Sequence, residues 1–192
     1  MTKIAILASH NGSGFDTLYD AYKNKLLDIE IVLVISNNSN AKVLQKANDI
    51  GIENIIINNK LYEDAEQTIF NLLQEKQCDI VFLSGYMKKI SSILTNNFRI
   101  INSHPSLLPL YGGPGMYGIY VHEAVISNCE TISGVTIHEV NENYDEGKII
   151  LQQSLELDSK ETVHSLEKRI KNLEKTTIVE AFKTVLSQSN LV

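Results

Sequence analysis

Tryptophan is absent from the sequence, and cysteine and proline are scarce, with two and three residues respectively. Cys78 and Cys129 lie far apart and form no CxxC pair, which argues against a disulfide framework, so we expect two buried free thiols. No apolar run approaches the roughly 20 residues that cross a bilayer, and the N-terminus lacks the segmented pattern of a signal peptide. These absences predict a cytoplasmic protein with no membrane partner.

Charge is also not concentrated anywhere along the chain. The net charge is −6, and lysine and arginine are interspersed with acidic residues rather than gathered in a run. A nucleic-acid surface needs a basic patch, so we predict no nucleic-acid partner, whereas a small phosphorylated ligand needs only a few local donors. Since no HxxH, HExxH or Cys/His cluster is present, we predict no metal site.

Length and composition fit one globular domain. The 192 residues are 43% hydrophobic and 21% charged, which is an ordinary balance for a chain that buries a substantial core. No repeat, linker or low-complexity tract interrupts the sequence. We therefore expect a single domain over residues 1–192.

The first hundred residues alternate short apolar runs with segments of helical periodicity. Strands are expected at residues 3–9, 30–36, 55–57, 80–83 and 100–101, and helical stripes at 15–26, 43–50 and 65–73. Near-continuous apolar strands separated by amphipathic helices are typical of a parallel sheet covered on both faces. The pattern predicts a doubly wound, Rossmann-like α/β fold with a mostly parallel sheet flanked by helices.

The second half begins with a long shaped loop. All three prolines fall between residues 105 and 114, and four of the ten glycines crowd in or just behind that stretch, directly after the fifth expected strand. Ligands of such sheets bind at the carboxyl ends of strands. A helix near 120–128, strands at 135–138 and 149–151, and a closing helix with Asp158 as its N-cap should follow.

Three polar segments are candidates for chemistry. Gly12, Ser13 and Gly14 stand between the first strand and helix, where backbone N–H groups attract phosphate, although a simple turn explains them equally well. Asn102 and His104 leave the same side of a strand, which would let an amide and an imidazole stabilise an oxyanion together. Asp145, in a polar loop, would raise the pKa of His104 if the two side chains met.

Simpler interpretations stay open for the histidines. His104 could be satisfied by loop carbonyls, and His122, His138 and His164 are each explained by a place on a helix or strand. No serine or cysteine stands in a nucleophile elbow, which argues against a covalent enzyme intermediate.

Four strings then identify a family. Residues 101–109 (INSHPSLLP), 115–126 (GMYGIYVHEAVI), 133–140 (SGVTIHEV) and 144–150 (YDEGKII) resemble the formyltetrahydrofolate-dependent transferases. Within them, the length and the order of motifs resemble the phosphoribosylglycinamide formyltransferases, from the first strand to the last helix. The resemblance implies transfer of a formyl group from 10-formyltetrahydrofolate, a co-substrate, to the amine of a glycinamide ribonucleotide, with no metal, in a monomer or homodimer.

The resemblance also implies roles for individual residues. The catalytic trio would be Asn102, His104 and Asp145, with the first two binding the formyl oxygen and Asp145 keeping His104 charged and oriented. The substrate-binding residues would be Gly12, Ser13, Gly14 and Glu174. The folate-binding residues would be Met87, Lys88, Lys89, Ile90, Val140, Asn141 and Tyr144.

The sequence departs from the family pattern mainly around the ligand-binding loops. His10 replaces the first glycine of the phosphate loop, and Gly14 replaces an asparagine that helps to bind substrate. Lys88 replaces an arginine, and the family arginine near position 63 has no counterpart. These changes affect phosphate and folate-tail binding and leave the trio intact.

Other functions remain as alternatives. A formyltransferase acting on another amine, such as a nucleotide-linked amino sugar, would share the trio. A non-catalytic folate-binding module would have no chemical reason to keep all three residues. A nicotinamide-dependent oxidoreductase would need a full GxGxxG and an acidic residue after the second strand, where residues 36–38 read Ser-Asn-Asn.

Overall fold

The last four residues of strand β1 (Thr2–Leu7) are fully buried, as expected for an inner strand that is covered on both faces. In the computed structural model, which describes residues 1–189, β1 pairs in parallel with a strand on each side. The strands are β1, β2 (Ile29–Ser36), β3 (Asn54–Ile56), β4 (Ile80–Leu83), β5 (Arg99–His104), β6 (Ile132–Glu139) and β7 (Ile149–Glu156).

Across the described residues, seven strands form a sheet in the order β3-β2-β1-β4-β5-β6-β7. Pairings among β1 to β5 are parallel, whereas β6 and β7 are antiparallel. The α/β fold with a mostly parallel sheet is thus confirmed. Because a parallel sheet brings carboxyl strand ends to one edge, the segments that follow β1 and β4 lie at the same edge of the first unit.

The chain divides into two compact units, Met1–Asn102 and Ser103–Val192, and β5 crosses the boundary between them. The expectation of one domain over residues 1–192 stays a prediction, and its last three residues lie outside the described part.

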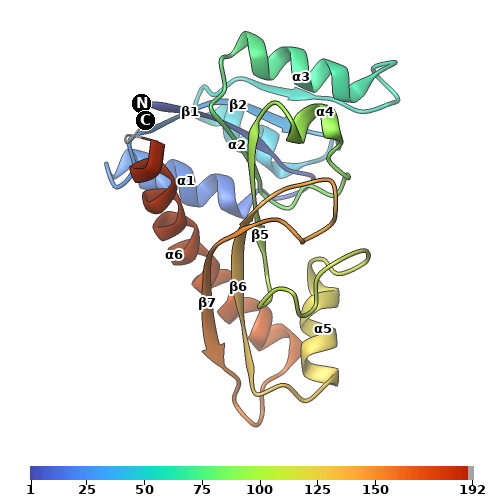
Figure 1. Cartoon of the computed structure of the whole chain (residues 1–192), viewed down its shortest axis with the longest axis vertical. Helices are drawn as coiled ribbons and strands as arrows, with labels where there is room; N and C mark the ends of the chain where they lie inside the picture. Colours follow the sequence, from blue (N-terminus) through green and yellow to red (C-terminus); the bar gives the residue numbers. More distant parts are fainter. Residues whose placement is uncertain (190–192) are drawn as a thin grey trace. The chain divides into compact units, whose positions relative to one another are not determined.

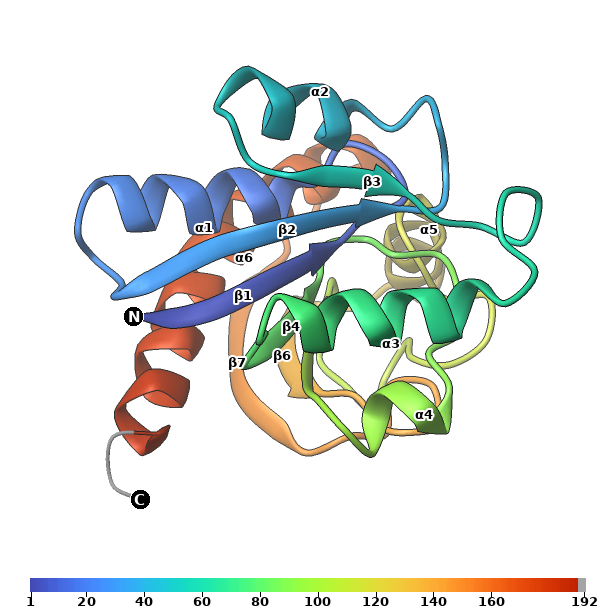
Figure 2. The ribbon, with the colours of Figure 1, turned by 90° about the horizontal axis from the view of Figure 1, so that it is seen from above.

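In the first unit, the helices that connect the strands lie on both sides of the sheet. They are α1 (Ser13–Lys23), α2 (Lys42–Asp49), α3 (Ala65–Glu75) and α4 (Ser92–Thr95). Helices α1 and α2 lie on one side of β1 to β3, and α3 and α4 lie on the other (Figure 2). The core between these layers includes Phe15, Leu33 and Phe82, which are at most 1% exposed. This is the doubly wound arrangement that the sequence predicted.

The second unit is built on the hairpin of β6 and β7, with α5 (Ile119–Ser127) and α6 (Val163–Ser189). Helix α6 packs against both strands and against α5, and Figure 1 shows it along the side of the hairpin. The buried stripe of α6 includes Leu166, Ile170, Ile178 and Phe182 at helical spacing.

Two details differ from expectation. Helix α6 begins at Val163 rather than after Asp158, because Thr162 Oγ1 accepts a hydrogen bond from the Ser165 N–H while Ser165 Oγ accepts one from the Thr162 N–H. Asp158 instead accepts the N–H of Lys160 in the preceding turn. The expectation of two buried thiols is wrong, since Cys78 is partly exposed and Cys129 is exposed.

No helix within residues 1–189 is long and apolar enough to cross a membrane.

Candidate active site

The loop after β5 is fixed to the hairpin of the second unit by one buried hydroxyl. Thr136 Oγ1 donates to the carbonyl of Ser106 at 2.7 Å and accepts the N–H of Leu108 at 3.0 Å. The Gln152 side chain donates to the Leu108 carbonyl as well. These bonds hold the backbone directly after His104, so the end of β5 is firmly placed.

His104 is held at both ring nitrogens in the second unit. The residue is 4% exposed, and its Nε2 lies 2.8 Å from the carbonyl oxygen of Tyr111. Because a carbonyl only accepts, Nε2 carries a proton, and Nδ1 faces Asp145 Oδ2 at 3.6 Å. The predicted meeting of His104 and Asp145 is therefore present in the structure.

Asp145 sits between two imidazoles. Its other oxygen, Oδ1, lies 3.6 Å from His138 Nε2, and the backbone N–H of Gly113 donates to Oδ2 at 2.9 Å. Burial opposes ionisation, but the His138 imidazole, the His104 ring and the Gly113 N–H together outweigh it, so the pKa of Asp145 lies below its ordinary value. Asp145 is thus a carboxylate at neutral pH.

The pKa of His104 is lowered from its ordinary value. Burial is the largest cause and outweighs Asp145 and the Tyr111 carbonyl, both of which raise the pKa. Asp145 therefore acts in the direction that the sequence suggested, but it does not keep His104 charged by itself. Negative charge developing on a bound ligand would favour the imidazolium further.

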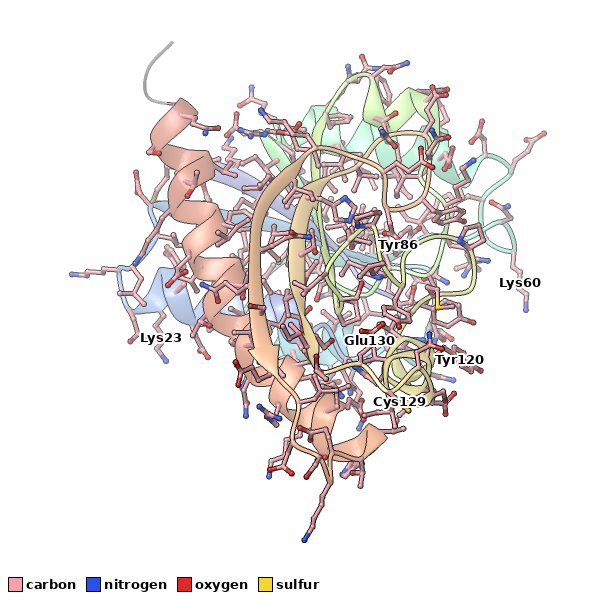
Figure 3. The ribbon with its side chains drawn as sticks, turned by 60° about the horizontal axis from the view of Figure 1, so that its bottom comes forward. Lys23, Lys60, Tyr86, Tyr120, Cys129 and Glu130 are labelled. Carbon is pink, nitrogen blue, oxygen red and sulfur yellow. The ribbon has the colours of Figure 1, made fainter. Side chains whose placement is uncertain are left out.

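Tyr111 ties the His104 contact to the end of α5. Its hydroxyl donates to Glu130 Oε1 at 2.5 Å and accepts from the Asn128 side chain at 2.9 Å. Figure 3 shows Glu130 beside Cys129 next to α5. Tyr111 has a φ of 57°, which is unusual for a residue with a side chain, and its carbonyl and hydroxyl groups are both held by polar contacts.

Asn102 precedes His104 by two residues on β5, so alternation sends both side chains to one face of the strand. Ser103, between them, points to the opposite face. Its Oγ donates to Glu174 Oε1 on α6 at 2.5 Å. Of the predicted substrate-binding residues, Glu174 is thus tied directly to β5.

The predicted phosphate loop lies at the N-terminus of α1 in the first unit. Gly12 is the N-cap with a left-handed φ of 63°, where an added Cβ would lie 2.5 Å from Val43 Cγ2, so glycine is required. Ser13 is exposed. The Gly14 N–H is already used, because it donates to the buried Ser84 Oγ at 2.9 Å.

The predicted folate segment after β4 lies beside that loop in the same unit. The Met87 N–H donates to Ser9 Oγ at 2.8 Å, and the Ser9 N–H donates to the Gly85 carbonyl. Met87, Lys88 and Lys89 are exposed and Ile90 is buried. In the second unit, Val140 is partly exposed, and Asn141 and Tyr144 are exposed on the loop between β6 and β7 that contains Asp145.

Sequence reasoning missed four residues that the structure brings to these sites. His138 was read as a strand residue and contacts Asp145, while Ser84 and Ser9 support the first-unit loops. Lys46 Nζ donates to the Asn11 carbonyl at 2.8 Å and pairs with Asp16, placing a cation beside the phosphate loop. Of the four, only His138 lies in a string that carries the family resemblance, residues 133–140.

A buried imidazole faces a carboxylate at the end of an inner strand of a doubly wound α/β fold, and this arrangement is suited to acid–base chemistry. The chain belongs to the formyl transferase family, whose model matches residues 2–182. Within the described residues, no group of three or more His, Cys, Asp or Glu side chains is arranged to hold a metal ion.

Named relatives agree with the family. Phosphoribosylglycinamide formyltransferase of Bacillus subtilis is 32% identical, with 99% of this chain and 97% of the relative aligned. The chloroplastic enzyme of Arabidopsis thaliana is also 32% identical over 97% of this chain, which spans 66% of that protein's length; the corresponding share is 61% for the Vigna unguiculata enzyme.

Solved structures of phosphoribosylglycinamide formyltransferases also match the chain. Phosphoribosylglycinamide formyltransferase from Bacillus halodurans matches with a TM-score of 0.89 and 30% identity over 98% of this chain and 97% of the other. Glycinamide ribonucleotide transformylase 1 from Geobacillus kaustophilus matches with a TM-score of 0.88 and 28% identity, over 97% of this chain and 99% of the other. The resemblance read from the sequence is confirmed.

Proposed function

We propose that the chain transfers the formyl group of 10-formyltetrahydrofolate to the amine of N1-(5-phospho-D-ribosyl)glycinamide, giving the formylated ribonucleotide and tetrahydrofolate in purine biosynthesis. The observation that carries the proposal is the contact between the buried His104, the last residue of β5, and Asp145 in the loop between β6 and β7. Family membership and the relatives' names support the choice of donor and acceptor.

The chemistry assigned to the trio is stabilisation of an oxyanion with proton transfer. The substrate amine attacks the formyl carbon, and negative charge collects on the formyl oxygen while the amine becomes acidic. Asn102 and His104 donate to that oxygen, and the Asp145 carboxylate favours the imidazolium as the charge develops. Breaking the bond to the folate nitrogen then requires a proton on that nitrogen, which the amine proton supplies through Asp145 or His104.

Binding residues are proposed separately for each unit. In the first unit, Gly12 and Ser13 at the start of α1 suit the phosphate, with Lys46 close to the loop. The exposed Met87, Lys88 and Lys89 suit the folate. In the second unit, Val140, Asn141 and Tyr144 are proposed for the folate and Glu174 for the ribonucleotide. A cytoplasmic location and a monomer or homodimer complete the proposal.

Spectrophotometric turnover with glycinamide ribonucleotide and a 10-formyl folate tests the function, with His104→Ala beside the unchanged chain. We expect turnover that falls by about a hundredfold or more in the variant, because a positioned acid–base group contributes at least that much. Retention of folate binding by calorimetry serves as the folding control. Folate binding without turnover in the unchanged chain would exclude this acceptor and direct a search among other amines.

A further inference from the structure

Ser103 lies between two residues assigned to the reacting centre, yet its side chain leaves β5 on the other face. Its hydroxyl donates to Glu174 Oε1 at 2.5 Å, a length expected for a hydroxyl bound to a carboxylate. A strand that presents Asn102 and His104 on one face thus contacts, through its other face, the acid on α6. Both residues of this contact belong to the second unit.

Glu174 keeps some exposure to solvent although its carboxyl lies largely among protein atoms, and it has binding capacity for a ligand. In the part of the chain that the structure describes, the Ser103 hydroxyl is the one hydrogen-bond donor to its carboxylate, and it contacts Oε1. A carboxylate accepts up to about four hydrogen bonds, so Oε2 has room for an incoming donor. Lys171, one turn earlier on α6, is the charged group whose field reaches Glu174.

We propose that Ser103 is a positioning residue for substrate: its hydroxyl anchors one oxygen of Glu174 so that the other faces a hydroxyl or amide N–H of the ribonucleotide. The inference rests on the proposed function, and it assigns Ser103 to binding rather than to the formyl transfer. Glu174 would bind a part of the substrate that does not react, since the Ser103 side chain leaves β5 on the face opposite to Asn102 and His104.

The energetics favour such an anchor. Burial raises the pKa of Glu174, while the Ser103 hydroxyl and Lys171 lower it, so the hydroxyl holds the carboxylate in its charged, accepting form. Without the hydroxyl, Glu174 would be harder to ionise and free to rotate about its side-chain bonds. Both effects weaken binding to a ligand donor.

Steady-state kinetics of Ser103→Ala and Ser103→Thr test the proposal. We expect the KM for the ribonucleotide to rise by about tenfold in Ser103→Ala, the effect of one hydrogen bond to a charged group, with kcat and the KM for folate unchanged. Ser103→Thr keeps the hydroxyl and should restore the KM. In a Glu174→Gln background, Ser103→Ala should add little, because the two residues act as one unit. A fall in kcat with an unchanged KM would overturn the assignment.

A second measurement needs no substrate. The pKa of the Glu174 carboxyl, followed by carbon NMR with pH, should be higher in Ser103→Ala than in the unchanged chain and should return in Ser103→Thr. An equal pKa in all three would refute the anchor, whatever the kinetics show. Failure of the unchanged chain to turn over the ribonucleotide would instead refute the proposed function, with the titration still deciding whether Ser103 controls Glu174.

Discussion

Asp145 meets His104 at Nδ1 across 3.6 Å, with the two side chains 12% and 5% exposed. The opposite ring nitrogen is occupied by the Tyr111 carbonyl. In this arrangement both nitrogens of His104 face protein groups, so the proposed donation from His104 to the formyl oxygen requires a shift of the ring or of the Tyr111 turn. Asp145 would keep its position during such a shift, since the Gly113 N–H and His138 hold its side chain from two other directions.

Asp145→Asn tests the electrostatic part of this pairing. Asp145 raises the pKa of His104, so its neutral replacement should lower that pKa further and reduce the imidazolium fraction at every pH. We expect kcat to fall by about a hundredfold or more and the limb of the pH–rate profile that reports His104 to move to lower pH. A profile that keeps its shape and position would argue that Asp145 acts only by packing.

His138→Ala tests whether the second imidazole supports Asp145. Removing it leaves the Asp145 carboxylate with one fewer partner, and its pKa should rise toward the ordinary value. We expect turnover to fall by about tenfold, less than for Asp145→Asn, because the loss equals roughly one polar contact to a charged group. His164→Ala is the matched control, since that side chain is 92% exposed. Equal activity of both variants would remove His138 from the site.

The fold could be predicted because short apolar runs in the sequence mark its inner strands. The runs at Ile4–Leu7 and Ile80–Leu83 are apolar without interruption, and only a strand covered on both faces buries every residue of such a run. The start of α6 was missed because Asp158 and Thr162 are both good N-caps followed three residues later by a polar partner. The reciprocal hydrogen bonds of Thr162 and Ser165 place the start of the helix at Val163, while Asp158 caps the preceding turn.

The site could be predicted only in part. Asn102 and His104 are neighbours on one strand, so periodicity alone places them on one face. Asp145 lies in a loop and contacts His104 on β5 and His138 on β6, two strands that are far apart in sequence. Residue spacing does not predict such long-range contacts. The same reason hid the Ser84 hydroxyl that takes up the Gly14 N–H.

His122→Leu tests a source of acid sensitivity. His122 is 3% exposed, its Nδ1 is a buried nitrogen without a partner among residues 1–189, and burial lowers its pKa. In the unfolded chain His122 therefore binds a proton with the ordinary pKa of 6.5, whereas in the folded chain it binds that proton only at lower pH. Stability from this group is complete above that value and is lost as the pH falls from it through the lower pKa of the folded state.

We expect the unfolding free energy of His122→Leu to change less than that of the unchanged chain between about pH 7.5 and about pH 5.5. Urea unfolding at both pH values measures the difference, and His164→Leu at the exposed position is the control. His104, whose pKa is also lowered, should leave part of the slope in place. An identical slope in the variant would mean that the unfolded state does not gain the proton that this reasoning assigns to it.

Gly14→Ala tests why the phosphate loop departs from the family. Alanine stabilises a helix by about 1 kcal/mol over glycine, but a Cβ here would lie 2.5 Å from Phe82 Cε1 and 2.9 Å from Ser84 Oγ. Overpacking of this kind costs about 1–3 kcal/mol, so urea unfolding should find the variant less stable, while Ser13→Ala in the same turn changes little. Adding Phe82→Leu should recover part of the loss by opening space for the Cβ.

If Gly14→Ala is as stable as the unchanged chain, the ring of Phe82 moves aside readily, and an asparagine at position 14 becomes sterically possible. If the loss appears, Gly14, Phe82 and Ser84 form one packed unit, and a single substitution cannot restore the family's asparagine.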